Sequence, residues 1–323
     1  MTGAAANKGE STSDALLVSI VIPAYNHAGV LAVAIDSLLA QDYPALEIIV
    51  LDDGSTDNTC AVLETYGTRV HWETHANMGQ AATLNKGWGM AHGVLLGYLS
   101  ADDFLFPGAI STSVAALATA PDAIVTYCDF DIVDPVGRPI RRVNRPEFSL
   151  ENMLSTLDCP PGPGALFRRS AFENAGGWNP TLRQIPDLDY WLRLACHGRF
   201  IHIPRALAAW RVHPGSQSFA TVSEERAEES VRVISAFFAA PSLDPRLGAL
   251  RPRAMARAHI YCAQLHLRAG RYRAAFANIA TAHRLFPATL VQPETWRSAA
   301  NALFSRPAHC LLWWLRKIGD AKT

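Results

Sequence analysis

The chain has 323 residues, enough for one large domain and an accessory region, and its 49% apolar content supplies a hydrophobic core. Its formal charge is zero, and we expect no nucleic-acid partner. Residues 1–244 nevertheless carry 16 basic against 27 acidic side chains, whereas 245–323 carry 13 against 2, so we treat them as different modules. The chain contains neither a P-loop nor a Gly-x-Ser-x-Gly elbow, which argues against P-loop nucleotide hydrolysis and serine hydrolase chemistry.

The first 15 residues are small and polar, and we expect a flexible tail there. Short apolar runs then alternate with segments of helical spacing. The predicted strands are 16–22, 46–51, 69–74 and 94–99, and the predicted helices are 30–40, 57–65, 79–91 and 107–119. This alternation predicts an α/β fold with a Rossmann-like, mainly parallel sheet flanked by helices.

Beyond Pro121 the pattern loosens. A strand is expected near 123–130, and strands near 200–203 and 206–212 follow a helix-rich block at 170–197. Between them lie an Arg-rich loop at 138–146 and a Gly/Pro segment at 160–164 that cannot be helical. From 221 to 323 the chain is rich in Ala, Arg and Leu at helical spacing, which predicts an all-helical C-terminal region.

Two acidic turns follow predicted strands. One is Asp52-Asp53-Gly54-Ser55-Thr56-Asp57, and the other is Ser100-Ala101-Asp102-Asp103. Ligands of open α/β sheets bind beyond the carboxyl ends of the strands, so the two turns are expected to meet at one pocket. Carboxylates there suit Mg²⁺ or Mn²⁺ and polar nucleotide edges, although either motif alone is also an ordinary turn or helix cap.

The six cysteines are scattered, without the close pairs that zinc sites or redox motifs need. They indicate the reduced thiols of a cytoplasmic protein.

Four motifs in order resemble the inverting family 2 glycosyltransferases of the GT-A fold. They are Val18-Ser19-Ile20-Val21-Ile22-Pro23-Ala24-Tyr25-Asn26, the turn at 52–57, Asn77-Met78-Gly79 and Leu99-Ser100-Ala101-Asp102-Asp103. Each motif alone is weak, but the ordered set spans 17 to about 215. The resemblance implies a GT-A domain over 16–220, a nucleotide-diphosphate sugar donor, a divalent metal (Mn or Mg) and transfer with inversion. It further implies a glycan or glycolipid acceptor, in surface polysaccharide assembly.

The resemblance also implies the donor-side residues. Pro23, Ala24, Tyr25 and Asn26 would line the nucleotide pocket, and Asp52 would accept a hydrogen bond from the base. The family's Asp-x-Asp motif departs at its first position here, so Ser100 and Ala101 stay on the nucleotide side and Asp102 contacts the metal. His213 would reach the metal or the diphosphate, unless it is a structural histidine.

On the acceptor side, Asp187 to Arg193 resembles the family segment in which a Glu-Asp pair opens a helix. Pro186 takes the Glu position, and Asp187 takes the position of the general base. Asp189 is the alternative base, and Asp187 could instead be only a favourable helix N-terminal residue. The acceptor side is expected to include Gly164, Trp178 and Asp189.

The C-terminal region carries two further signals. Gly270-Arg271-Tyr272, with Ala275, Ala282 and Pro287, matches a tetratricopeptide-type helix pair, the alternative being a helical appendage on the catalytic domain. Leu311 to Lys317 is apolar and aromatic with basic flanks, which suits either peripheral contact with the inner membrane face or a closing core helix.

Two other functions stay open at this point. A sugar nucleotidyltransferase shares the topology but needs a Gly-rich, Arg-containing loop after its first strand, which Pro23 to Asn26 does not provide. A non-catalytic sugar-nucleotide-binding or scaffolding protein would explain Ser100 and Pro186, which stand where the family has carboxylates.

Overall fold

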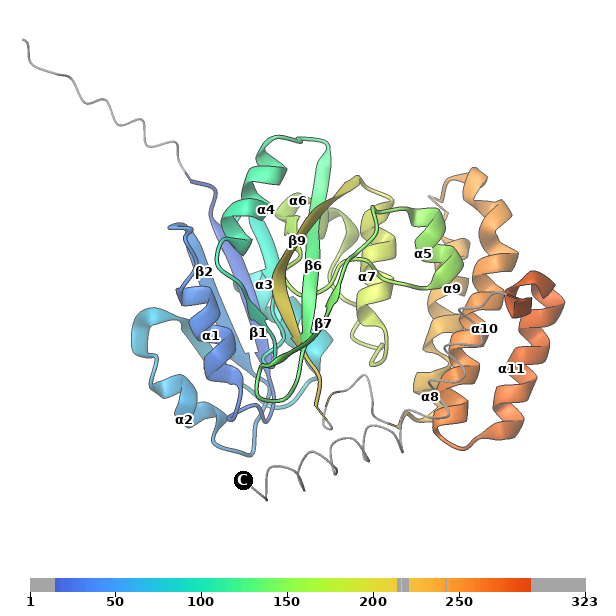
Figure 1. Cartoon of the computed structure of the whole chain (residues 1–323), viewed down its shortest axis with the longest axis horizontal. Coiled ribbons are helices and arrows are strands. Elements are labelled where there is room, and N and C mark those ends of the chain that lie inside the picture. The colour runs from blue at the N-terminus through green and yellow to red at the C-terminus, as the bar shows by residue number, and fades with distance from the viewer. Residues whose placement is uncertain (1–14, 214–215, 217–220, 242, 292–323) are drawn as a thin grey trace, which may run out of the picture.

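The computed structural model describes residues 15–213, 216, 221–241 and 243–291 (Figure 1). Their strands are β1 (Val18–Ala24), β2 (Leu46–Asp52), β3 (His71–Thr74), β4 (Leu95–Tyr98), β5 (Phe104–Leu105), β6 (Ala123–Val133), β7 (Pro139–Val143), β8 (Leu166–Arg168) and β9 (Arg199–Arg211). The helices flanking them are α1 (Leu31–Leu39), α2 (Thr59–Glu64), α3 (Gln80–Met90), α4 (Ala109–Ala118), α5 (Leu150–Thr156), α6 (Arg169–Ala175) and α7 (Pro186–Ala195). The helices that follow are α8 (Glu224–Ala227), α9 (Glu229–Ala239), α10 (Arg251–Arg268) and α11 (Tyr272–Leu285).

The described strands form one mixed sheet in the order β3-β2-β1-β4-β8-β6-β9-β5, with β7 paired to β6. β3, β2, β1 and β4 run parallel, and so do β6 and β9, whereas β8, β7 and β5 are antiparallel to their neighbours. Ala24 pairs with Asp52, which pairs with Thr74, so the ends of β1, β2 and β3 lie level. The predicted mainly parallel α/β fold is confirmed.

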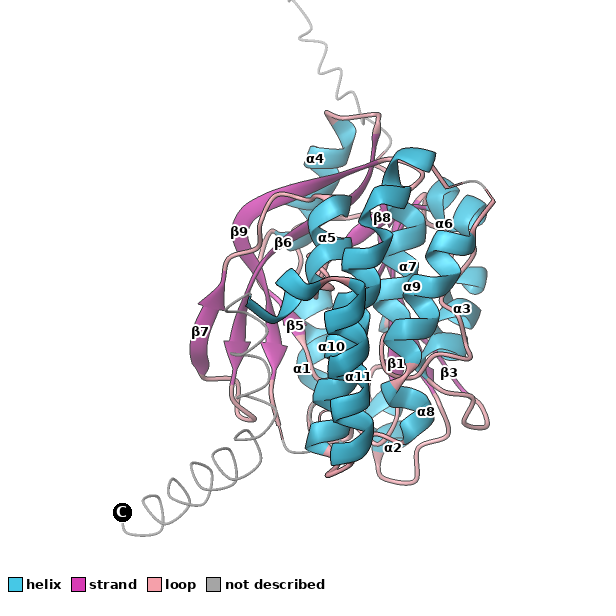
Figure 2. Ribbon diagram, turned by 90° about the vertical axis from the view of Figure 1, so that its right-hand side faces the viewer, coloured by secondary structure: helices cyan, strands magenta, loops and turns pink. Residues whose placement is uncertain are grey.

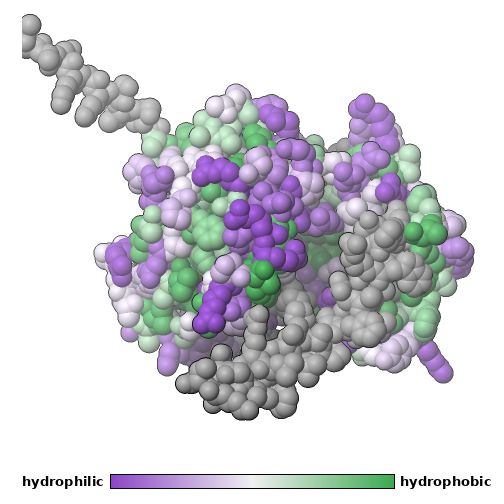
Figure 3. Space-filling model, in the orientation of Figure 1, coloured by the Kyte–Doolittle hydropathy of each residue, from purple (hydrophilic) through white to green (hydrophobic). Residues whose placement is uncertain are grey.

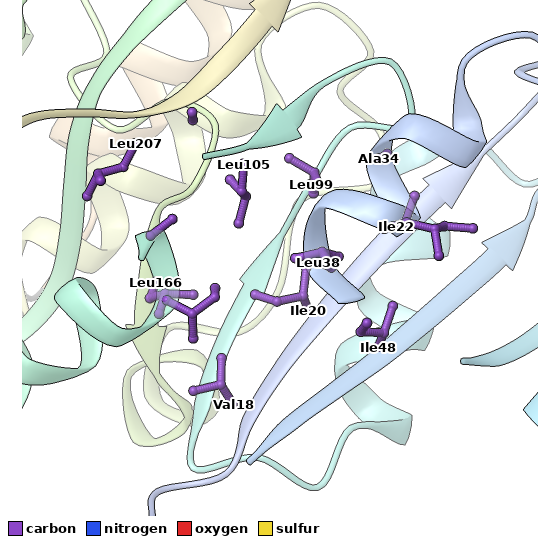
Figure 4. Close-up of a cluster of buried hydrophobic side chains, with 14 of the residues drawn as sticks. Val18, Ile20, Ile22, Ala34, Leu38, Ile48, Leu99, Leu105, Leu166 and Leu207 are labelled. Atoms are coloured by element: carbon purple, nitrogen blue, oxygen red, sulfur yellow. The ribbon is translucent and has the colours of Figure 1, made fainter. Parts of the chain in front are cut away.

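Helices cover both faces of this sheet, and β1 is therefore buried along its whole length. Its side chains alternate between the faces, because successive strand residues point in opposite directions. Val18, Ile20 and Ile22 join a cluster with α1 that also takes in Ile48 of β2 (Figure 4). Val21 packs into a second cluster on the other face.

The helical region shares that second cluster with the α/β domain. Ile234 of α9 and Ala258 of α10 pack in the same core as Tyr190 and Trp191 of α7. α7 accordingly lies between the central strands and the helices α9, α10 and α11 (Figure 1), and α10 and α11 run side by side (Figure 2). Among the described helices none is long and apolar enough to cross a membrane.

Some predictions fall outside the described residues, namely the tail at 1–14 and the apolar segment at 311–317. The helix pair at the tetratricopeptide-like spacing is present as α10 and α11, while its relation to that repeat stays a prediction.

Two local predictions were wrong. The Arg-rich segment at 138–146 contains the strand β7, in which Arg141 and Arg142 are exposed. Hydrophilic residues gather near the middle of the face that Figure 3 shows. The strands near 200–203 and 206–212 are one strand, β9. Its register with β6 shifts at Pro204 and Arg205, where a bulge accommodates the missing backbone N–H of proline.

Candidate active site

A cavity of about 1020 Å³ opens where β1, β2 and β4 end, the place at which open α/β sheets bind ligands. This volume lies at the upper end of the range that is typical of pockets for small-molecule ligands. Most of the predicted site residues line it, namely Pro23, Ala24, Tyr25, Asn26, Ser100, Ala101, Asp102, Trp178, Asp187 and His213. The structure therefore brings these residues from five separate segments to one place.

Asn26 connects the turn after β1 to the turn after β2 through hydrogen bonds. Its backbone has a φ of 56°, in the left-handed region that asparagine tolerates better than most residues. Its amide nitrogen donates to Ser55 Oγ at 2.8 Å, and its Oδ1 accepts from the backbone N–H of Thr56 at 2.8 Å. The neighbouring Tyr25 is left exposed at the cavity.

The predicted role of Asp52 requires a correction, because its side chain is fully buried and does not line the cavity. Its carboxylate accepts hydrogen bonds from Thr74 Oγ1 at 2.7 Å and from the backbone N–H of Ser55 at 3.3 Å. Burial alone would raise the pKa of Asp52, but hydrogen bonds from Ser55, Thr74 and Cys60 outweigh it and lower that pKa below its ordinary value.

Asp53, the residue directly after β2, lines the cavity with its acidic side chain. Its two carboxylate oxygens accept from the backbone N–H groups of Met78 at 2.6 Å and Gly79 at 2.8 Å. Asp53 thus holds the Asn77-Met78-Gly79 motif against the end of β2, just before α3 begins.

Asp102 and His213, each predicted from the sequence to reach the metal or its surroundings, lie close together, with Oδ2 of Asp102 3.0 Å from Nε2 of His213. Arg211, two residues earlier on β9, donates from Nε to the backbone oxygen of Asp102 at 2.8 Å. Its backbone N–H donates to Oδ1 of the buried Asp103 at 2.9 Å. Burial lowers the pKa of the nearby His27, although the charge of Asp102 opposes that shift.

The residues around Asp102 fit a divalent cation that takes its remaining ligands from phosphate oxygens and water. Within the described part of the chain no three His, Cys, Asp or Glu side chains cluster as ligands for an ion. The Asp102–His213 pair supplies one carboxylate and one imidazole, and Ser100 lines the same cavity. Mg²⁺ and Mn²⁺ are commonly held by one or two carboxylates together with phosphate oxygens and water, which matches this donor set.

Asp187, the predicted general base, lies in the first turn of α7, directly after Pro186. It is half-buried on the cavity wall, and burial raises the pKa of its carboxyl group. Its Oδ1 accepts from the backbone N–H of Leu188 at 2.9 Å. Trp178 also lines the wall, and among the described residues its buried Nε1 has no hydrogen-bond partner.

Two acceptor-side predictions do not hold in this geometry. Asp189 does not line the cavity, and its carboxylate pairs with Arg193 at 2.8 Å. Gly164 also lies off the wall, where a Cβ would sit 3.3 Å from Leu105, and its φ of +83° favours glycine. Its neighbours Gly162 and Pro163 line the cavity instead.

Several cavity residues were missed by the sequence analysis, among them Arg145, Arg183 and Tyr261, which come from distant segments. Arg145 holds the Gly/Pro segment through bonds to Pro160 O at 3.1 Å and Asp158 Oδ1 at 3.0 Å. Arg183 lies so close to Gly79 that a Cβ there would be 1.4 Å from its guanidinium. Tyr261 comes from α10, so the helical region contributes to the wall.

Comparison with known proteins agrees with this geometry, since the model of glycosyl transferase family 2 matches residues 19–176. The chain carries a family 2 glycosyltransferase domain. It is similar to an uncharacterised glycosyltransferase of Rickettsia typhi, with 29% identity over 55% of this chain and 58% of that protein. It is also similar to two Pasteurella multocida enzymes, chondroitin synthase (30% identity, 67% of this chain, 23% of the synthase) and hyaluronan synthase (33%, 58% and 19%).

The chain that carries this family 2 domain spans little more than half the length of the Rickettsia protein and under a quarter of either synthase. Two solved structures share its fold at low sequence identity. S. aureus TarS 1–349, in complex with UDP-GlcNAc, gives a TM-score of 0.61 at 16% identity over 85% of this chain and 92% of TarS. The mannosyltransferase PcManGT from Pyrobaculum calidifontis, in complex with GDP-Man and Mn²⁺, gives 0.59 at 20% identity over 91% and 89%.

Proposed function

We propose that this protein transfers a sugar from a nucleotide-diphosphate donor to a hydroxyl of a glycan or glycolipid acceptor, with inversion at the anomeric carbon. One observation carries the proposal: a single cavity contains both the Asp102–His213 pair and the carboxyl group of Asp187, whose pKa is raised. The similarity to two polysaccharide synthases supports a role in surface polysaccharide assembly. From the scattered cysteines of the sequence, we place the reaction in the cytoplasm.

The donor would bind at the ends of β1, β2 and β4. Tyr25 offers an exposed aromatic face to the nucleobase, and Asp53 takes the place proposed from the sequence for Asp52. Arg145 and Arg183 line the same cavity and supply positive charge for a diphosphate.

Asp102 and His213 would hold a Mg²⁺ or Mn²⁺ ion. Such an ion, when bound, neutralises the negative charge that develops on the departing diphosphate. A neighbour of the same fold binds Mn²⁺ with GDP-Man, which supports metal use here.

The chemistry proposed for the chain's own residues is a single displacement. The acceptor oxygen forms a bond to the anomeric carbon from the face opposite the diphosphate, and the bond from that carbon to the diphosphate oxygen breaks with its electron pair. The acceptor proton passes to the carboxylate of Asp187, whose raised pKa brings it closer to the working pH of a general base. Trp178, which lines the same cavity, would contact the acceptor.

A panel of nucleotide sugars tests the proposal. UDP-N-acetylglucosamine, UDP-glucuronic acid, GDP-mannose and other donors are added with Mn²⁺ or with EDTA, and the melting temperature is recorded. A true donor at 100 times its dissociation constant adds about 2.7 kcal/mol to the free energy of unfolding. Release of the nucleoside diphosphate is then measured. Binding without release would favour the non-catalytic alternative that Ser100 suggests, and no stabilisation by any donor would contradict both.

A further inference from the structure

Glu229, the first residue of α9, makes an unusual set of contacts with the segment that leads into α7. Its side chain is only 1% exposed. Its Oε1 accepts from the backbone N–H of Arg183 at 2.8 Å, and its Oε2 accepts from those of Gln184 at 2.6 Å and Ile185 at 3.2 Å. One buried carboxylate of the helical region therefore satisfies three consecutive backbone donors of the α/β domain.

A second contact from the helical region holds the same segment. Arg226 of α8 donates from a guanidinium nitrogen to the backbone oxygen of Arg183 at 3.0 Å. Both backbone polar groups of Arg183 are thus bound by side chains that lie after residue 220. The Arg183 side chain in turn lies against Gly79 on the donor side of the cavity.

The held segment continues directly into the proposed base. Ile185 precedes α7, makes no side-chain cap bond, and is followed by Pro186 and Asp187 in the first turn. The first N–H groups of a helix have no partner within it, so a helix start needs contacts from elsewhere to be fixed in place. Here a contact from Glu229 fixes the last residue before the helix.

We infer that Glu229 is a positioning residue that sets the location of Asp187 on the cavity wall, so that the helical region is part of the catalytic unit. The inference rests on the proposed function, in which Asp187 is the base. Misplacement of a reacting group by about 1 Å can cost 10²-fold in rate, so a small shift of this segment is expected to be visible in turnover.

The variant Glu229→Gln keeps the size of the side chain but replaces one acceptor oxygen by an N–H donor that faces backbone donors. We expect turnover to fall by about 10- to 100-fold while donor affinity changes little. Glu228→Gln is the matched control, because Glu228 is the adjacent glutamate and is exposed. It removes the same charge, and its turnover should stay at the wild-type level.

Hydrogen exchange gives a readout that needs no substrate. The amides of residues 183–185 should exchange faster in Glu229→Gln than in the wild type, and Glu228→Gln should leave them protected. Unchanged protection in a folded Glu229→Gln protein would overturn the inference. If that variant fails to fold, Glu229→Asp, which keeps both acceptor oxygens on a shorter stem, is measured in its place with the same expectation.

A double-mutant cycle separates the two proposals. If Glu229 acts through Asp187, then Glu229→Gln should lower donor hydrolysis much less in the Asp187→Asn background than alone. Equal losses in both backgrounds would mean that Glu229 supports the fold in general, which contradicts the inference. Full turnover of Asp187→Asn would instead remove the base from the proposed function, whatever the exchange data show.

Discussion

Asp102 and His213 are 111 residues apart in the sequence, yet a carboxylate oxygen of one lies 3.0 Å from the Nε2 of the other. Arg211 keeps this arrangement in place, because it binds the backbone oxygen of Asp102 and the side chain of Asp103 from the end of β9. The turn after β4 and the residues after β9 are thereby joined at the cavity, although β4 and β9 are not neighbours in the sheet.

The first prediction concerns metal binding at this pair. Asp102→Ala should abolish the Mn²⁺-dependent part of donor binding without lowering the melting temperature, since a carboxylate on a cavity wall contributes little packing. His213→Ala should weaken that part by about 10- to 100-fold. Calorimetry with and without Mn²⁺ measures both, and His283→Ala, an exposed histidine of α11, serves as the control. Wild-type Mn²⁺ dependence in a folded Asp102→Ala protein would refute the metal assignment.

The second prediction separates Asp52 from the donor site. Asp52→Ala should lower the free energy of unfolding by about 1–3 kcal/mol at neutral pH, because Thr74 and the Ser55 N–H lose their acceptor. The native pKa of Asp52 is lowered, so its carboxylate stabilises the fold at neutral pH, and that stabilisation disappears as the pH falls through the native pKa. Urea unfolding at several pH values should show the gap between variant and wild type closing in acid.

Asp52→Ala also tests whether the Asp52 side chain contacts the nucleobase. Its effect on affinity should be the same for UDP, GDP and ADP, since the side chain does not reach the cavity. A selective loss for one base would restore the role that the sequence suggested for Asp52.

The confusion between Asp52 and Asp53 shows what the sequence could and could not predict. Apolar runs and acidic turns located the ends of β2 and β4 correctly, because a strand covered on both faces is apolar throughout. Consecutive residues at a strand end point in different directions, and the sequence does not say which of two adjacent carboxylates faces the ligand. Only the hydrogen bonds of the folded chain distinguish them.

The sequence could not predict the site residues that distant elements contribute, for a different reason. Tyr261 lines the cavity only because α10 packs against the core around α7, and nothing in its local sequence marks it. Glu229 is one of four glutamates among 224–229, and it alone of these is buried. The strands β5 and β8, with two and three residues, are too short to show any periodicity.

The third prediction concerns the general base. Asp187→Asn should lower turnover by about 10²- to 10⁴-fold while donor affinity stays near the wild-type value, because a base acts only in the transition state. Asp189→Asn is the control: its carboxylate pairs with Arg193 away from the cavity, so turnover should persist. The opposite pattern would make Asp189 the base, and full activity in both variants would leave the proposed reaction without one.

The last prediction concerns the stability of the same variant as the pH changes. Although a helix N-terminus favours negative charge, burial outweighs it and raises the native pKa of Asp187. The folded protein therefore holds this proton more tightly than the unfolded chain does. The resulting stabilisation is fully present below the unfolded pKa of Asp and is lost as the pH rises through the native value.

At neutral pH the wild-type protein consequently carries the cost of a half-buried charge at Asp187, and Asp187→Asn removes it. The variant should melt at a higher temperature than the wild type at pH 7 to 8. The difference should shrink as the pH falls through the native pKa of Asp187, and it should be smallest below about 3.9, the pKa of an unperturbed Asp, where the residue becomes protonated in both states. Thermal unfolding across this range measures the effect, and a melting temperature lowered equally at every pH would contradict it. A gain in stability at neutral pH together with a loss of turnover is the result expected of a catalytic carboxylate that is retained for activity at the expense of stability.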